Sequence, residues 1–149
     1  MHESFKLKTK EGKDIEDNID LLKEIIDARL DDTNIINDKA KREIVLKSGG
    51  NLRQLIKLVK ESALVSHKNK ATSISEYDVE KALFTLKRDY SSATTEIKDF
   101  LNYIKEFKIP ENYEKETLEK LKIATNESLI FAYFNGEIWY DLNPIIADV

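Results

Sequence analysis

Apolar residues recur at three- and four-residue spacing in four stretches of the first 90 residues, a pattern typical of amphipathic helices. The stretches cover residues 18–30, 37–47, 52–67 and 76–90, and the first is expected to end at the turn formers 31–34. In the third, we expect the buried face to consist of Leu52, Leu55, Ile56, Val59 and Ala63. Four such helices joined by short connections predict a compact helical bundle.

The pattern changes after residue 96. A helical stripe from Ile97 to Phe107 stops before Pro110, a weaker helix is expected over 114–125, and two apolar runs then flank Asn135-Gly136. Asn-Gly between such runs predicts a β-hairpin with a two-residue loop.

A two-residue loop would pair Tyr133 with Ile138 and place one apolar face of the hairpin against the two preceding helices. The members of that face would be Leu129, Phe131, Tyr133, Ile138, Tyr140 and Leu142. Trp139 would lie on the other face with Ile130, Ala132 and Phe134. That second face is also apolar, so we expect it to contact the helical bundle or another molecule.

The two weakly patterned stretches suggest how the chain is divided. Residues 5–10 alternate like an edge strand, which would fold back onto the hairpin, be disordered, or pair with a sheet outside this chain; we favour the last. Residues 91–95 are small and polar and make the best internal boundary. The expected organisation is an N-terminal linker over 1–16, a helical bundle over 17–92 and a C-terminal unit over 93–149.

Composition narrows the class of protein. The chain has 149 residues, 41% hydrophobic and 35% charged, as expected of a soluble, helix-rich globular protein. It contains no cysteine, which excludes disulfides and thiolate sites and favours a reducing compartment. No apolar run approaches the roughly 20 residues of a membrane span, and the first residues lack a signal-peptide core. We therefore expect a cytoplasmic protein that does not bind membranes.

Charge is spread unevenly along the chain, whose net charge is −4. Residues 34–70 hold nine Lys and Arg against three Asp and Glu, whereas residues 96–149 hold six against eleven. An anionic ligand is therefore expected at the first segment. The hairpin, from Leu129 to Leu142, carries Glu137 and Asp141 and no basic residue, which argues against DNA binding there.

The basic segment contains the turn Ser48-Gly49-Gly50-Asn51-Leu52-Arg53. Paired glycines permit left-handed backbone angles that end one helix, and Asn51 is a suitable cap for the next. Arg53 then places a cation in the first turn of that helix, where it opposes the helix dipole by a few tenths of a kcal/mol. Either a bound anion offsets this cost, or Arg53 is an ordinary solvated residue.

This turn resembles the sensor-2 motif in the lid of AAA+ ATPases, and residues 74–83 are similar to the last helix of that lid. The resemblance covers residues 18–90. The helices and hairpin that follow resemble a reduced winged-helix domain. The implied fold is mainly α, with a four-helix AAA+-type lid bundle followed by a small α+β winged-helix-like unit containing one hairpin.

The resemblance also implies a function. Arg53 would be the sensor-2 arginine that acts in ATP hydrolysis, and Gly49, Gly50, Asn51 and Arg53 would face the nucleotide. The single Gly12-Lys13 pair is followed by Asp14 and makes no phosphate-binding loop, so ATP and Mg²⁺ would be held by an N-terminal P-loop domain outside this chain. Neighbouring ATPase subunits are further expected partners, and the chain alone should be inactive.

No metal site or catalytic triad is predicted, because no residue pattern resembles either; His2 and His67 are the only histidines, and His67 is expected at the surface. The alternative function is a self-contained helical adaptor without a nucleotide role, which would bind another protein through the Trp139 face.

Overall fold

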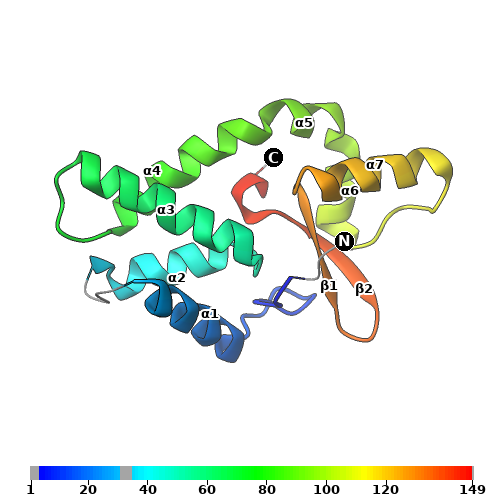
Figure 1. Cartoon of the computed structure of the whole chain (residues 1–149). Helices are drawn as coiled ribbons and strands as arrows, with labels where there is room; N and C mark the ends of the chain where they lie inside the picture. The colour runs from blue at the N-terminus through cyan, green and yellow to red at the C-terminus, as the bar shows by residue number, and fades with distance from the viewer. Residues whose placement is uncertain (1–3, 31–34, 149) are drawn as a thin grey trace.

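The computed structural model describes residues 4–30 and 35–148, so the expected turn at 31–34 and His2 lie outside the described residues. The fold is mainly helical and has one two-stranded antiparallel sheet near the C-terminus (Figure 1). The elements are α1 (Glu16–Arg29), α2 (Asp38–Lys47), α3 (Leu52–Lys68), α4 (Glu76–Lys87), α5 (Ser91–Glu96), α6 (Lys98–Phe107), α7 (Lys115–Asn126), β1 (Ile130–Phe134) and β2 (Ile138–Leu142). Short 3-10 turns follow α4 (η2, Arg88–Tyr90) and β2 (η3, Pro144–Ile146).

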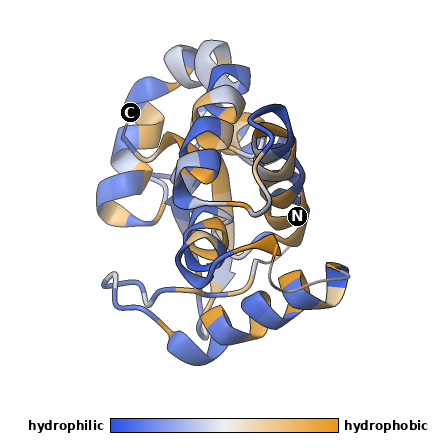
Figure 2. Ribbon diagram, turned by 90° about the vertical axis from the view of Figure 1, so that its left-hand side faces the viewer, coloured by the Kyte–Doolittle hydropathy of each residue, from blue (hydrophilic) through white to orange (hydrophobic). Residues whose placement is uncertain are grey.

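The four helices expected in the first 90 residues are all present as α1 to α4. α1 packs along α2, and α3 packs along α4 (Figure 1). Hydrophobic patches recur between hydrophilic ones along the helices (Figure 2), as the three- and four-residue spacing of amphipathic helices produces. Local caps fix where the helices begin, since the side chain of Asn37 accepts from the N–H of Ala40 at 2.8 Å and the side chain of Asp78 accepts from the N–H of Ser75 at 2.9 Å.

The buried face of α3 differs from the predicted one. Its buried residues are Gln54, Leu55, Leu58, Ser62 and Ser66. Leu52, by contrast, is 40% exposed, Ala63 is exposed, and Ile56 and Val59 are only partly buried. Two of the buried positions are small polar residues, Ser62 and Ser66, which are more easily buried than long side chains where neighbouring helices pack closely. Of the predicted face, only Leu55 is fully buried.

The predicted boundary segment, 91–95, is helical. Its hydroxyl groups bond to backbone carbonyls one turn earlier, with Thr94 Oγ1 donating to Tyr90 O at 2.7 Å and Thr95 Oγ1 to Ser91 O at 2.9 Å. α4, η2 and α5 therefore follow one another as an almost continuous arm (Figure 1).

One cluster of buried apolar residues has members from both sides of this segment. Val45 on α2 belongs to it from the N-terminal side, and Leu101 and Ile104 on α6 belong to it from the C-terminal side. All three side chains are fully buried. The helices before and after residues 91–95 therefore share a core.

The hairpin has a three-residue loop, Asn135 to Glu137, where two residues were predicted. Tyr133 pairs with Trp139, and Phe134 pairs with Ile138. A shift of one residue moves every β2 side chain to the opposite face, so the predicted register is wrong. Gly136, at φ +94°, accommodates the longer loop, and the new register brings the rings of Tyr133 and Trp139 to 4.7 Å between centroids.

Both faces of the hairpin contact other parts of the chain, although Phe134 and Ile138 beside the loop are 50 and 55% exposed. The face with Phe131, Tyr133 and Trp139 packs on the turn before α3, where the hydroxyl of Tyr133 donates to Gly49 O at 2.5 Å. The other face meets α6, and the N–H of Tyr140 donates to the carbonyl that follows this helix at 2.7 Å. Trp139 is 3% exposed, but it lies with Phe131 and Tyr133 and not with Ile130, Ala132 and Phe134, as the predicted register required.

The segment before α1 folds back onto the hairpin, the first of the three alternatives rather than the favoured one. The N–H of Ser4 donates to Ala132 O at 3.2 Å, and the N–H of Phe5 donates to Gly50 O at 3.0 Å. Leu7 is buried in the main core. The segment is thus held by single backbone bonds and does not form the predicted edge strand.

Candidate functional site

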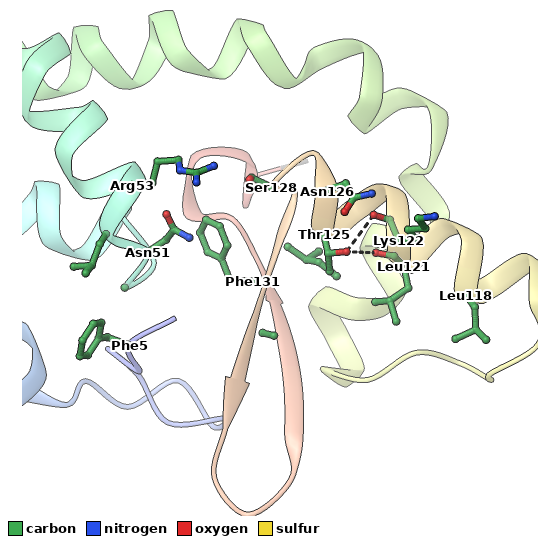
Figure 3. Close-up of a pocket in the computed structure, with 14 residues that line it drawn as sticks. Phe5, Asn51, Arg53, Leu118, Leu121, Lys122, Thr125, Asn126, Ser128 and Phe131 are labelled. Carbon is green, nitrogen blue, oxygen red and sulfur yellow. Dashed lines mark hydrogen bonds between the residues drawn. The ribbon is translucent and has the colours of Figure 1, made fainter. Parts of the chain in front are cut away.

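An open cleft of about 850 Å³ lies between the start of α3 and the wall formed by α7 and β1 (Figure 3). Its lining residues are Phe5, Gly50, Asn51, Leu52, Arg53, Leu118, Leu121, Lys122, Thr125, Asn126, Ser128, Ile130, Phe131 and Ala132. Arg53 and Lys122 are cationic, and none of these fourteen described residues is Asp or Glu. The lining thus favours an anion, in a chain whose net charge is −4.

The two glycines before α3 are needed for packing. Gly49 and Gly50 have φ of +63° and +80°. A Cβ on Gly50 would lie 1.7 Å from the carbonyl oxygen of Phe5, and one on Gly49 would lie 2.7 Å from the ring of Phe131. Only glycine satisfies both the left-handed angles and these close approaches.

The N–H groups of this turn are already bonded. The N–H of Gly49 donates to Leu46 O at 3.3 Å, and that of Gly50 donates to the hydroxyl of Ser48 at 3.1 Å. Both glycines are buried, although Gly50 borders the cleft. Gly49 and Gly50, two residues of the predicted site, therefore shape the turn. Their own N–H groups are hydrogen-bonded within it.

Asn51 acts as the cap of α3. Its side-chain oxygen accepts from the N–H of Gln54 at 3.0 Å, while the residue itself lines the cleft and is partly buried. The first-turn N–H groups of Leu52 and Arg53 have no acceptor in their own helix, because a helix leaves its first donors unpaired. Asn51 thus fixes where α3 begins, and with it the position of Arg53.

Arg53 is exposed, as expected, and forms no ion pair within residues 4–30 and 35–148. Figure 3 shows its guanidinium group extending from the start of α3 toward the side of the cleft where Phe131 and Ser128 lie. Arg42 contrasts with it, because Arg42 bonds both carboxylate oxygens of Glu16 at 2.8 Å and holds the pKa of that carboxyl below its usual range. The guanidinium of Arg53 is therefore available to an external anion.

The opposite wall comes from α7. Lys122, Thr125 and Asn126 line it, and the hydroxyl of Thr125 donates to the carbonyl oxygens of Leu121 and Lys122 at 3.0 and 3.1 Å (Figure 3). The described lining offers cations, amides and apolar surface, but no carboxylate or imidazole that could act as a base. The arrangement suits binding of an anion rather than acid–base chemistry.

The structure contains a buried amide pair beside Arg53 that was not predicted from the sequence. Gln54 Nε2 donates to Asn143 Oδ1 at 2.6 Å, and Asn143 Nδ2 donates to Gln54 Oε1 at 2.8 Å. Gln54 also donates to Lys47 O at 2.9 Å, and Asn143 to Ser128 O at 2.9 Å. The pair joins the start of α3 to the chain that follows β2. The only sign of this pair in the sequence is the polar residue Gln54 at a buried helix position, and that sign does not identify Asn143 as its partner.

Other site classes find no support in the described part of the chain. No group of three or more His, Cys, Asp or Glu residues there could hold a metal ion. His67 is exposed near the end of α3. Among residues 4–30 and 35–148, no helix is both long and apolar enough to cross a membrane.

Comparison of the chain with protein-family models, with curated proteins and with solved structures finds no match in any of the three.

Proposed function

We propose that α1 to α4 form the lid of an AAA+ ATPase, in which Arg53 contacts the phosphates of ATP held by a separate P-loop domain. The observation that carries the proposal is the exposed guanidinium of Arg53, placed by a capped helix start over a cleft with no acidic residue in its described lining. A helix N-terminus and an arginine together favour a phosphate.

In this role the P-loop domain binds ATP and Mg²⁺, which supply the phosphoryl-transfer chemistry. The chain contributes Arg53, which stabilises the negative charge that develops on the phosphate, and Asn51, which fixes the helix that carries it. The buried bonds from Gln54 to Asn143 and from Tyr133 to the turn before α3 tie the hairpin to the start of that helix. Rotation of the lid would therefore carry the C-terminal unit with it.

The proposed partners are the N-terminal P-loop domain of the same protein and, in an assembly, neighbouring ATPase subunits. A cytoplasmic location belongs to this proposal, since the enzyme would draw on cytoplasmic ATP. An adaptor function through Trp139 has less support, because Trp139 is only 3% exposed and its ring packs against that of Tyr133.

Three measurements test the proposal. The coding sequence adjoining this chain should encode a phosphate-binding loop, and turnover of the intact protein should fall about 10²-fold in Arg53→Ala, the scale of losing one preorganised donor. Arg88→Ala is the matched control, because Arg88 is an exposed arginine on η2 outside the cleft lining. Unchanged turnover in Arg53→Ala would overturn the assignment, as would steady-state ATP hydrolysis by this chain alone.

A further inference from the structure

A second concave surface lies between α1 and α3 and is apolar with a basic border. The groove has a volume of about 300 Å³. Its apolar walls include Ile25 of α1 and Ile56 and Val59 of α3. The charged residues of its lining are Arg29 and Lys60, and no acidic residue lines it within the described chain. This groove shares no lining residue with the cleft beside α7, so the two are separate surfaces.

The groove carries the part of α3 that sequence periodicity assigned to the interior. Ile56 and Val59 are partly buried, and Leu52, which continues their stripe, is 40% exposed. Lys57 and Lys60 are exposed on the same helix. An amphipathic helix that leaves its apolar stripe half covered and bordered by cations is suited to a partner surface with apolar side chains and acids.

The chain presents such an acidic apolar surface over residues 106–119, around the connection from α6 to α7. Phe107, Ile109 and Tyr113 are 49, 42 and 69% exposed there. The segment contains five glutamates against two lysines, and one of these lysines is paired with Asp141 at 2.8 Å. This acidic apolar surface lies at the other end of the molecule from the α1–α3 groove (Figure 1).

We propose that copies of this chain associate head to tail, with the acidic apolar surface of one copy docked in the α1–α3 groove of the next. Glutamates of the first copy would meet Arg29 and Lys60 of the second. The groove has about twice the ~150 Å³ that holds a benzene-sized group, which is room for two apolar side chains. Because the two surfaces differ, the contact is heterologous and each copy can bind one neighbour at each end. This association does not depend on the proposed lid function.

Sedimentation velocity of the chain across a wide range of concentrations tests the proposal. We expect the mean mass to rise with concentration and the association to weaken at high salt, since the contact uses charge. Arg29→Glu with Lys60→Glu should weaken it about tenfold or more. Lys68→Glu with Lys70→Glu is the control, because it makes the same charge change at exposed positions outside the groove. A chain that stays monomeric throughout, or equal loss in the control, would overturn the proposal.

A charge-swap experiment distinguishes loss of the contact from failure of a variant to fold. Glu106→Lys with Glu111→Lys reverses the charge at two exposed positions of the acidic apolar surface, and this variant alone should likewise associate about tenfold more weakly or more weakly than that. An equimolar mixture of the groove variant and this variant restores opposite charges at each contact, so association should return. A mixture that remains monomeric, with both variants folded by circular dichroism, contradicts the head-to-tail contact.

Discussion

The turn before α3 and the first turn of α3 itself are adjacent in sequence but differ in environment. Gly49 and Gly50 are buried, and their left-handed angles and lack of side chains are required by Phe5 and Phe131. Arg53, three residues on, is exposed at an open cleft. A short motif can therefore combine residues fixed by packing with one residue left free. The glycines alone say little about a ligand, and the functional hypothesis depends on Arg53.

The largest expected effect on stability compares a substitution on the buried side of α3 with one at its exposed start. Leu58→Ala should lower the free energy of unfolding by about 2 to 5 kcal/mol, because Leu58 is fully buried and its truncation leaves a cavity. Leu52→Ala, at 40% exposure, should cost less than about 1 kcal/mol. Denaturant unfolding of both variants measures the difference. Equal losses would show that the exposed start of α3 is as well packed as its core side.

The second effect tests the packing role of the turn. Gly50→Ala should lower the free energy of unfolding by about 2 to 4 kcal/mol, since it adds left-handed strain and a clash with the Phe5 carbonyl. Gly136→Ala is the control, because Gly136 has φ +94° but an added Cβ would meet nothing within 4 Å. The control should lose only the strain, about 1 to 2 kcal/mol. Equal losses of stability in Gly50→Ala and Gly136→Ala would show that the clash with the Phe5 carbonyl does not contribute.

A smaller effect concerns the bond that closes the turn. Tyr133→Phe removes the donor to Gly49 O and should cost about 1 to 2 kcal/mol at neutral pH, as measured by chemical unfolding. Burial, with a further contribution from Asp141, raises the pKa of Tyr133 above its usual value, so the neutral form is favoured in the folded state.

The sign of the pH dependence follows from this shift. The stabilisation is fully present below the unfolded pKa of about 10 and is lost as pH rises above it toward the raised folded pKa. Tyr133→Phe should therefore lose stability less steeply than the parent above about pH 10. Burial raises the pKa of Tyr90 and Tyr140 as well, so some slope remains. Chemical unfolding across alkaline pH measures it, and identical slopes would contradict the assignment to Tyr133.

The smallest expected effect is at Arg53. Arg53→Ala should change the free energy of unfolding of this chain by no more than about 0.5 kcal/mol, because the side chain is exposed and outside every ion pair of the described residues. Thermal unfolding beside the parent chain checks this. A strong loss of stability would make Arg53 structural, like the glycines before it, and would end the contrast between the two regions.

The elements that could be predicted from sequence are those set by local chemistry. The starts of α2, α3 and α4 follow from Asn37, Asn51 and the pair Ser75–Asp78, whose bonds span three residues. The existence of the hairpin follows in the same way from its Asn-Gly turn. Local rules of this kind require no knowledge of the rest of the fold.

The errors arose where distant contacts decide between local alternatives. Loops of two and three residues both suit an Asn-Gly turn, and the contact between the tilted rings of Tyr133 and Trp139 belongs to the second. The apolar periodicity of α3 predicts one buried face, but the structure buries Ser62 and Ser66 while leaving Leu52 and Ala63 exposed. The exposure of Arg53 could be predicted from its place in the helix, but the wall that α7 adds opposite it could not.

The bonds between Gln54 and Asn143 form late in the synthesis of the chain. The two residues are 89 positions apart, so on the ribosome α3 emerges long before the side chain that completes its first turn. Helical pairs such as α3 and α4 can form as they leave the exit tunnel, since their contacts are short in sequence. Until synthesis has passed the hairpin, the Gln54 side chain has only its local acceptor, Lys47 O, and lacks Asn143. A stall or a premature stop before Asn143 would release a bundle in which the helix start that carries Arg53 is left unfinished.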